Sequence, residues 1–195
     1  MNLPNKLTVM RMALIPVFLV FMLVESIPHR YLIAAVIFAA ASFTDYLDGH
    51  IARRDGLVTN FGKLMDPLAD KIMVMSALVC FVANGMTNTV FVLLIMVREF
   101  AVTSIRLIAV EQGRVIPANN WGKAKTVSQI VAICIVLLTQ YILDLGAYGI
   151  LALPTETLSP IFTWVNFVVM AIATLLAVVS GIIYAKDAKD LFTEL

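Results

Sequence analysis

The sequence predicts an all-α membrane protein: a bundle of six transmembrane helices with both termini in the cytosol. Three observations lead to this prediction: the composition, the spacing of the apolar segments and the distribution of basic residues. Of the 195 residues, 61% are hydrophobic and 14% are charged, and the mean hydropathy is +0.95. Soluble domains are closer to half apolar and a quarter charged. The composition therefore excludes a disordered chain, a nucleic-acid-binding tail and an ordinary soluble enzyme.

Six apolar segments have about the 20 residues that a membrane helix needs. They are expected at residues 7–24, 31–53, 66–83, 89–111, 123–143 and 160–186. Turn-forming residues separate them, at Pro28, Asn84-Gly85, Gly113, Asn119-Asn120 and 146–154. No internal repeat divides the chain, so residues 1–195 are expected to form a single domain.

The basic residues orient these segments. Thirteen of the 14 Lys and Arg residues fall on one side of the expected membrane, and only Arg30 falls on the other. Because cytosolic loops carry the excess of Lys and Arg, this side is expected to face the cytosol. A cleaved signal peptide is the alternative for the first segment. However, the stretch from Val24 to Pro28 lacks a small-residue cleavage site, which favours a retained span.

Carboxylates occupy the cytosolic ends of the second and third spans, where charge is costly. Asp45 and Asp48 are three residues apart, and Asp66 and Asp70 are four apart, so each pair shares one helical face. Measured from Tyr31, Asp45 lies about 21 Å along a span that crosses a hydrocarbon core of about 30 Å. Carboxylates at such a depth face the helix bundle or a water-filled cavity, not lipid.

The two pairs are expected to form one divalent-metal site. A short connection at residues 55–60 joins the two antiparallel helices, so the pairs can meet at the same depth. Four neighbouring carboxylates repel each other, and two divalent cations would balance their charge. All-oxygen ligands suit Mg²⁺, Mn²⁺ or Ca²⁺. The simpler interpretation is a set of helix-end salt bridges, of Asp48 with Arg53 or Arg54 and of Asp66 with Lys63.

Small residues accompany the carboxylates. Gly49, Ala52 and Gly62 leave room for a ligand to approach the helix backbone closely. The whole pattern is Asp45-x2-Asp48-Gly49-x2-Ala52-Arg53-x8-Gly62-x3-Asp66-x3-Asp70. It resembles the complete signature of the CDP-alcohol phosphotransferase family, and residues 3–11 are similar to that family's opening segment. The resemblance implies a six-helix bundle in the cell membrane, usually a homodimer, with a cavity facing the cytosol.

Within the family, the chain is most similar to bacterial members that join CDP-diacylglycerol to sn-glycerol 3-phosphate, giving phosphatidylglycerophosphate and CMP. The similarity rests on chain size, the opening segment, Arg98-Glu99 and residues 122–126. It implies that two Mg²⁺ or Mn²⁺ ions are held by Asp45, Asp48, Asp66 and Asp70. Asp70 is then the general base toward the acceptor hydroxyl. The implied contacts to CDP are Asp45, Gly49, Ala52, Arg53 and Gly62.

A basic pocket is expected for the phosphate of the acceptor. The candidates are Arg98, Arg106, Lys123 and Lys125. Arg106 lies two turns beyond Arg98, on roughly the same helical face. Alternatively, Arg106 snorkels to the interface and Arg98 forms a structural network with Glu99. Asn5, Thr8 and Arg11 are candidates for contacts to a substrate phosphate at the cytosolic mouth, or for a helix cap and interfacial anchor.

Two other functions remain as alternatives. A phosphatidylserine or cardiolipin synthase of the same family would keep the aspartate signature and change the basic pocket. A divalent-cation transporter would also place carboxylates on facing helices. It would need polar groups along the outer half of its path, whereas the outer halves of the second and third spans carry no charge. Phosphatidyl transfer is therefore the expected function.

Overall fold

The structure is a computed structural model of six α-helices. It describes residues 3–55, 60–114, 120–152 and 154–189, with side chains described from 7–44, 68–69, 71–114, 120–152 and 154–189. No strand occurs among these residues. The helices are α1 (Leu3–Leu23), α2 (Arg30–Asp55), α3 (Asn60–Ala83), α4 (Thr89–Glu111), α5 (Asn120–Ala147) and α6 (Thr155–Asp187). The prediction of six helices is confirmed.

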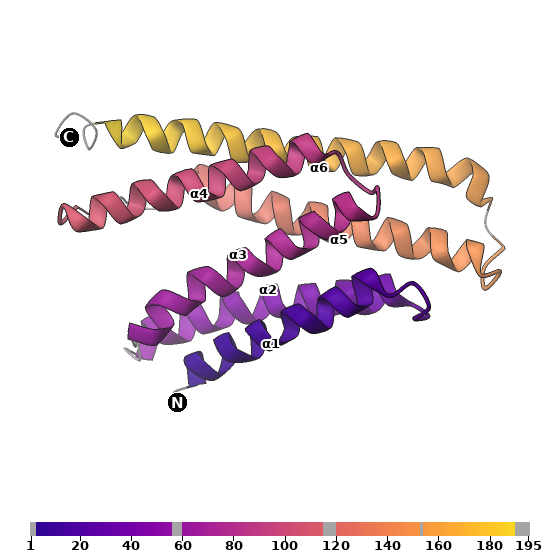
Figure 1. The fold of residues 1–195 in the computed structure, drawn as a ribbon, viewed down its shortest axis with the longest axis horizontal. Coiled ribbons are helices and arrows are strands. Elements are labelled where there is room, and N and C mark those ends of the chain that lie inside the picture. The colour runs from indigo at the N-terminus through magenta and orange to yellow at the C-terminus, as the bar shows by residue number, and fades with distance from the viewer. Residues whose placement is uncertain (1–2, 56–59, 115–119, 153, 190–195) are drawn as a thin grey trace.

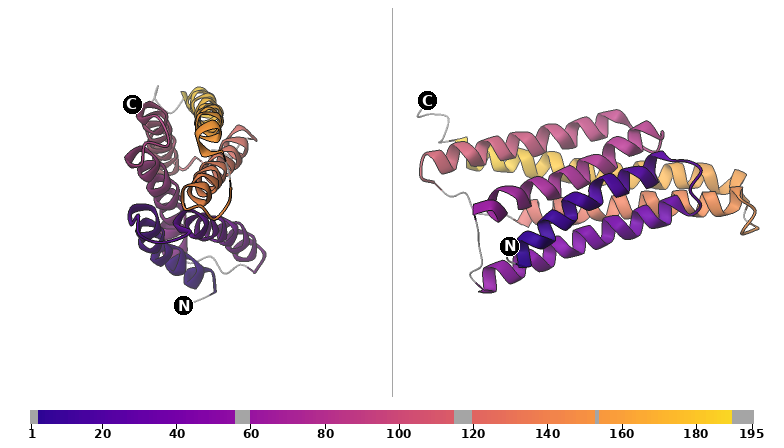
Figure 2. Two further views of the ribbon diagram at one scale, coloured as in Figure 1. Left: turned by 90° about the vertical axis from the view of Figure 1, so that its right-hand side faces the viewer. Right: turned by 60° about the horizontal axis from the view of Figure 1, so that its bottom comes forward.

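The helices run back and forth along one axis, so the start of α1 and the end of α6 lie at the same end of the bundle (Figure 1). Helices α1 and α2 pack together on one side, and α4 and α6 pack together on the other. Helices α3 and α5 lie between these two pairs: α3 contacts α1 and α4, and α5 contacts α2 and α6 (Figure 2). The end of α2 and the start of α3 therefore lie at the bundle end that carries the termini.

Glycine ends two of the helices at the places where the sequence predicts turns. Gly85 has φ +67°, its N–H donates to Val82 O, and the next N–H, of Met86, donates to Phe81 O. This is the hydrogen-bond pattern of a Schellman motif, which needs the left-handed conformation that glycine adopts without strain. The same motif follows α4 at Gly113, where φ is +70°.

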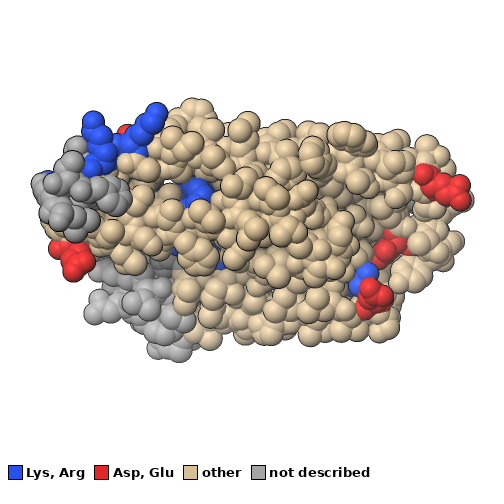
Figure 3. Space-filling view, turned by 45° about the horizontal axis from the view of Figure 1, so that its top comes forward, with Lys and Arg blue, Asp and Glu red and all other residues tan. Residues whose placement is uncertain are grey.

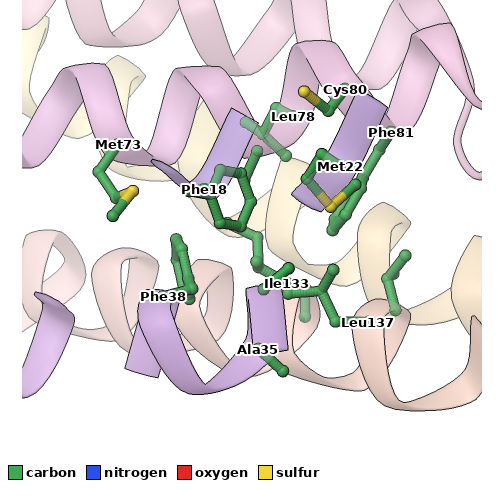
Figure 4. Close-up of a cluster of buried hydrophobic side chains, with 14 of the residues drawn as sticks. Phe18, Met22, Ala35, Phe38, Met73, Leu78, Cys80, Phe81, Ile133 and Leu137 are labelled. Atoms are coloured by element: carbon green, nitrogen blue, oxygen red, sulfur yellow. The ribbon is translucent and has the colours of Figure 1, made fainter. Parts of the chain in front are cut away.

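The main core lies between α1, α2, α3 and α5. Phe18, Phe38, Phe81, Ile133 and Leu137 are completely buried there and point toward one another (Figure 4). The rings of Phe18 and Phe38 lie 6.3 Å apart and are tilted by 49°, a favourable arrangement for aromatic pairs. A second, smaller cluster joins α4 and α6, formed by Val102, Ile105, Ala109, Tyr184 and Ala188.

The outer surface of the bundle is apolar. Val97, Leu107 and Trp164 have exposed fractions of 65%, 67% and 69%. Soluble monomers rarely expose a contiguous apolar surface of this kind. On the face shown in Figure 3, charged residues gather at the two ends and few lie in the broad band between them. Within the described part of the chain, α5 and α6 are long and apolar enough to cross a membrane.

The predicted segments coincide with the observed helices, with differences at their ends. The fourth segment, 89–111, matches α4 at both ends, whereas α3 begins at Asn60 and not at Asp66. Helix α6 begins at Thr155, ahead of Pro160, the residue at which its start was predicted. Pro160 is the sixth residue of α6, so the helix continues through a position that lacks the N–H for a bond to the Glu156 carbonyl. Arg98, which was counted with the cytosolic residues, lies near the middle of the 23-residue α4.

One buried polar contact should stabilise the α5–α6 pair. The Thr139 hydroxyl donates to Asn166 Oδ1 at 2.9 Å, and both side chains are buried. We expect Thr139→Val to lower the free energy of unfolding by about 1 kcal/mol, because Asn166 would lose its partner across the interface. Unfolding in mixed detergent micelles measures this. Thr163→Val is the matched control, since the exposed Thr163 hydroxyl bonds only within α6, and an equal loss there would contradict the assignment.

Candidate active site

The aspartate signature lies on two neighbouring helices at one end of the bundle. Asp45 and Asp48 are in the second half of α2, and Asp66 and Asp70 are in the first half of α3. The chain connects these two helix ends directly, as the sequence analysis predicts. The side chains of these four residues, and of Gly49, Ala52, Arg53 and Gly62, lie outside the described residues.

The donor set suits a hard divalent cation. Helical spacing places two carboxylates on one face of α2 and two on one face of α3, and carboxylate oxygens are the preferred ligands of Mg²⁺ and Mn²⁺. Among the side chains that are described, no group of three His, Cys, Asp or Glu residues could hold a metal ion. The assignment of a metal site to the signature aspartates stays a prediction.

A hydrogen-bonded link joins the signature end of α3 to α4. Lys71, the residue after Asp70, donates from Nζ to the hydroxyl of Thr103 on α4. The Thr103 hydroxyl in turn donates to the backbone carbonyl of Glu99 at 2.6 Å. The link joins α3, one residue after Asp70, to Thr103 of α4, which lies one turn beyond Glu99.

Glu99 is the centre of a buried ionic network between α4, α5 and α6. Arg98 Nη1 donates to Glu99 Oε1 at 2.9 Å, and Lys125 Nζ contacts the same oxygen. Arg98 Nη2 donates to the Ser180 hydroxyl of α6 at 2.7 Å. Glu99 is 8% exposed and Lys125 is 6% exposed. Among the described side chains, the network thus joins two cations to one carboxylate across α4 and α5, with Ser180 of α6 as a third contact.

The path of the Arg98 side chain depends on a glycine in α6, Gly181. A Cβ at Gly181 would lie 2.8 Å from Cγ of Arg98, closer than real Cβ atoms come to another atom. Cγ belongs to the stem of Arg98 and not to its flexible end. Gly181 therefore leaves the space through which Arg98 reaches Ser180 and Glu99.

Arg106 lies two turns further along α4 and rests on Tyr184 of α6. Its Nε donates to the Tyr184 hydroxyl at 3.1 Å, and its guanidinium carbon lies 5.3 Å from the centre of the ring. Tyr184 is buried, whereas Arg106 is exposed. Among the described residues, the two terminal nitrogens of Arg106 have no recorded hydrogen bond. Arg106 is thus oriented at one nitrogen and keeps its other donors available.

The remaining candidates lie at the same end of the bundle. Lys123 is exposed in the first turn of α5. Thr8 and Arg11 are each 1% exposed in α1, which packs on α2 and α3. Arg11 therefore points into the bundle and not toward its outer surface. The side chain of Asn5 lies outside the described residues.

Several residues of this region were not identified from the sequence. Ser180, Gly181 and Tyr184 orient predicted basic residues, and Thr103 accepts a hydrogen bond from Lys71. None of these four residues belongs to a motif of its own. The contact between Lys125 and Glu99 joins helices whose order in space is not visible in the sequence. One available signal was Glu99 itself, since an ionisable residue in an apolar span implies a partner.

Comparison with known proteins defines the class to which this fold and site belong. The chain belongs to the CDP-alcohol phosphatidyltransferase family, whose model matches residues 1–182. The family resemblance read from the aspartate pattern is thereby confirmed.

Relatives within the family include CDP-diacylglycerol–glycerol-3-phosphate 3-phosphatidyltransferases. The Bacillus subtilis protein of this name is 47% identical over 148 residues, covering 70% of this chain and 77% of its own. The Rickettsia bellii protein of the same name is 34% identical, covering 98% of this chain and 97% of its own. A probable phosphatidylglycerophosphate synthase of Mycobacterium tuberculosis is 38% identical, covering 97% and 83%.

Proposed function

We propose that this chain transfers the phosphatidyl group of CDP-diacylglycerol to sn-glycerol 3-phosphate, giving phosphatidylglycerophosphate and CMP. The observation that carries the proposal is the complete aspartate signature on α2 and α3, in a chain that the family matches over residues 1–182. The names of the similar proteins support this acceptor in preference to serine or phosphatidylglycerol.

We propose that the enzyme lies in the cell membrane with six transmembrane spans. Both termini and the active site then face the cytosol. Six helices of alternating direction and an apolar outer surface support this topology. The termini lie at the bundle end that carries the signature, and most Lys and Arg residues belong to this end. A lipid substrate and a water-soluble acceptor both require a site open to membrane and cytosol. The family resemblance also predicts that the protein forms a homodimer.

Two divalent cations, Mg²⁺ or Mn²⁺, would be held by Asp45, Asp48, Asp66 and Asp70. When bound, such ions neutralise the charge that develops on attacking and leaving oxygens during displacement at phosphorus. Asp70 is the general base that takes the proton of the acceptor hydroxyl. Because metal coordination lowers the basicity of a carboxylate, Asp70 must be only loosely ligated. The CDP moiety is bound by Asp45, Gly49, Ala52, Arg53 and Gly62, whose small members allow close approach to α2 and α3.

The phosphate of the acceptor is bound by cations of α4 and α5. The proposed residues are Arg106, Arg98, Lys123 and Lys125. The available nitrogens of Arg106 and the exposure of Lys123 support this assignment. Asn5, Thr8 and Arg11 contribute polar contacts at the cytosolic mouth. The burial of Arg11 supports a contact inside the bundle over an outward interfacial anchor.

Arg106→Ala is expected to raise the KM for sn-glycerol 3-phosphate about tenfold, with a much smaller change in the KM for CDP-diacylglycerol. The reason is the loss of a charge-assisted hydrogen bond to the acceptor phosphate. Initial rates of CMP release with each substrate varied in turn measure this. Lys186→Ala, an exposed cation of α6, is the control. An unchanged acceptor KM would assign Arg106 to anchoring against Tyr184.

The acceptor assignment is tested by a panel of alcohols. Purified protein is supplied with CDP-diacylglycerol, Mg²⁺ or Mn²⁺, and sn-glycerol 3-phosphate, serine, inositol phosphate or phosphatidylglycerol. CMP release with sn-glycerol 3-phosphate alone is the expected result. Release with a different acceptor would keep the four-aspartate mechanism and overturn the acceptor assignment. Absence of release with every acceptor would favour a divalent-cation transporter.

A further inference from the structure

Tyr184 of α6 is a buried aromatic residue whose polar end meets a charged side chain of α4. Its side chain is 3% exposed, and its hydroxyl accepts a hydrogen bond from Arg106 Nε at 3.1 Å. The guanidinium carbon of Arg106 lies 5.3 Å from the centre of the ring. A buried tyrosine usually directs its hydroxyl to a hydrogen-bond partner. Here the partner is a residue that the proposed function assigns to the acceptor phosphate.

The position of the Tyr184 hydroxyl is fixed by the packing of its ring. The ring belongs to the smaller core cluster between α4 and α6, together with Val102, Ile105, Ala109 and Ala188. Tyrosine has only two side-chain torsions, and a close-packed core leaves little room for either to change. The hydroxyl is therefore an acceptor at a defined place beside α4.

Arg106, in contrast, is an exposed side chain. A long exposed side chain loses conformational entropy when a ligand orders it. The hydrogen bond at Nε and the contact of the guanidinium with the ring restrict Arg106 before any substrate arrives. A donor that is already oriented binds its ligand with a smaller entropic penalty than a mobile one.

The hydrogen bond to Tyr184 also determines which donors of Arg106 remain. A guanidinium binds phosphate best through a pair of parallel N–H groups. With Nε bonded to Tyr184, the pair that remains is Nη1 and Nη2, and neither has a recorded hydrogen bond within the described part of the chain. Arg98 shows the opposite arrangement, since its Nη1 donates to Glu99 and its Nη2 to Ser180. Of these two arginines of α4, Arg106 is the one whose terminal pair suits a phosphate.

We propose that Tyr184 is a positioning residue for the acceptor: its hydroxyl holds Arg106 at Nε, so that the Nη1–Nη2 end of the guanidinium meets the acceptor phosphate. The inference rests on the proposed function, in which Arg106 binds that phosphate. Tyr184 acts through Arg106 and does not itself touch substrate.

Tyr184→Phe tests this role, because it removes one oxygen atom and keeps the ring that fills the core cluster. Arg106 then loses its acceptor at Nε and becomes less well ordered. We expect the KM for sn-glycerol 3-phosphate to rise about threefold to tenfold, while the KM for CDP-diacylglycerol and the maximal rate stay within about twofold of wild type. Tyr148→Phe is the matched control, since it makes the same change at an exposed tyrosine directly after α5, and it should change neither KM.

A double-mutant cycle shows whether Tyr184 acts through Arg106. In an Arg106→Ala background, Tyr184→Phe should change the acceptor KM by less than about twofold, because the side chain that it positions is absent. Arg106→Lys approaches the same contact from its exposed side and keeps the proposal testable if Tyr184→Phe does not fold. Lysine retains the charge but has neither the Nε donor nor the paired terminal nitrogens. We expect it to raise the acceptor KM at least as much as Tyr184→Phe.

Three results would overturn the proposal. The first is an unchanged acceptor KM in folded Tyr184→Phe or in Arg106→Lys. The second is an equal rise of the acceptor KM in the wild-type and Arg106→Ala backgrounds, which would show that Tyr184 does not act through Arg106. The third is an equal rise of both KM values, which would show a structural role. Failure of the proposed function is distinguishable, because the wild-type protein would then show no CMP release dependent on sn-glycerol 3-phosphate.

Discussion

Asp66→Asn is expected to abolish CMP release while the protein remains folded. Asn keeps the size of the side chain but removes the negative charge, so the remaining carboxylates would hold the cations far less tightly. Replacement of residues that merely support a metal ligand costs about 10–100-fold, and loss of a ligand should exceed this range. The measurements are the initial rate of CMP release from CDP-diacylglycerol and the folded fraction by size-exclusion chromatography in detergent.

The control for this substitution is Asp144→Asn. Asp144 lies near the end of α5, at the opposite end of the bundle from the signature. Like Asp66→Asn, this substitution replaces one carboxylate by an amide. It should nevertheless leave the rate of CMP release unchanged. Substantial activity in Asp66→Asn, with the protein folded, would contradict the assignment of this aspartate to the metal site.

Asp70→Asn should remove turnover and spare nucleotide binding. The proposed function makes Asp70 the base for the acceptor hydroxyl and only a loose ligand. An amide cannot accept that proton, and general-base catalysis contributes about 10²–10⁴-fold. The affinity for CDP-diacylglycerol should therefore remain within about threefold of wild type. Equilibrium binding of the CDP-lipid in the presence of Mg²⁺, compared with the rate of CMP release, measures the two effects separately.

The comparison of Asp70→Asn with Asp66→Asn decides between two roles. If both substitutions weaken CDP-lipid binding equally, Asp70 is a full metal ligand and another group takes the proton. If only Asp66→Asn weakens binding, the two aspartates differ in role as proposed.

The sequence predicted the number of helices and their order because the membrane-like apolar segments are long and clearly separated. Gly85 and Gly113 marked helix ends correctly, since the left-handed turn that each occupies is local chemistry. The start of α3 was less predictable. The segment from Asn60 to Asp66 mixes hydrophobic residues with Asn60, Lys63 and Asp66, so it was left out of the apolar span, although nothing in its composition prevents a helix.

The candidate site was predictable to different degrees. The aspartates could be identified because three- and four-residue spacings place carboxylates on one helical face whatever the tertiary fold. The basic residues could be identified by charge, but their partners could not. Contacts such as Arg98 with Ser180 and Arg106 with Tyr184 join residues about 80 positions apart, and they depend on how α4 packs against α6. Local sequence holds no information on that packing.

The most direct test of the account is metal-dependent formation of both products in one reaction. Purified protein is treated with a chelator, then supplied with CDP-diacylglycerol and sn-glycerol 3-phosphate, with and without added Mg²⁺ or Mn²⁺. The account predicts that CMP and phosphatidylglycerophosphate form in equal amounts only when the metal is restored. Equal turnover in the chelated protein, or CMP release without formation of the phospholipid, would contradict it.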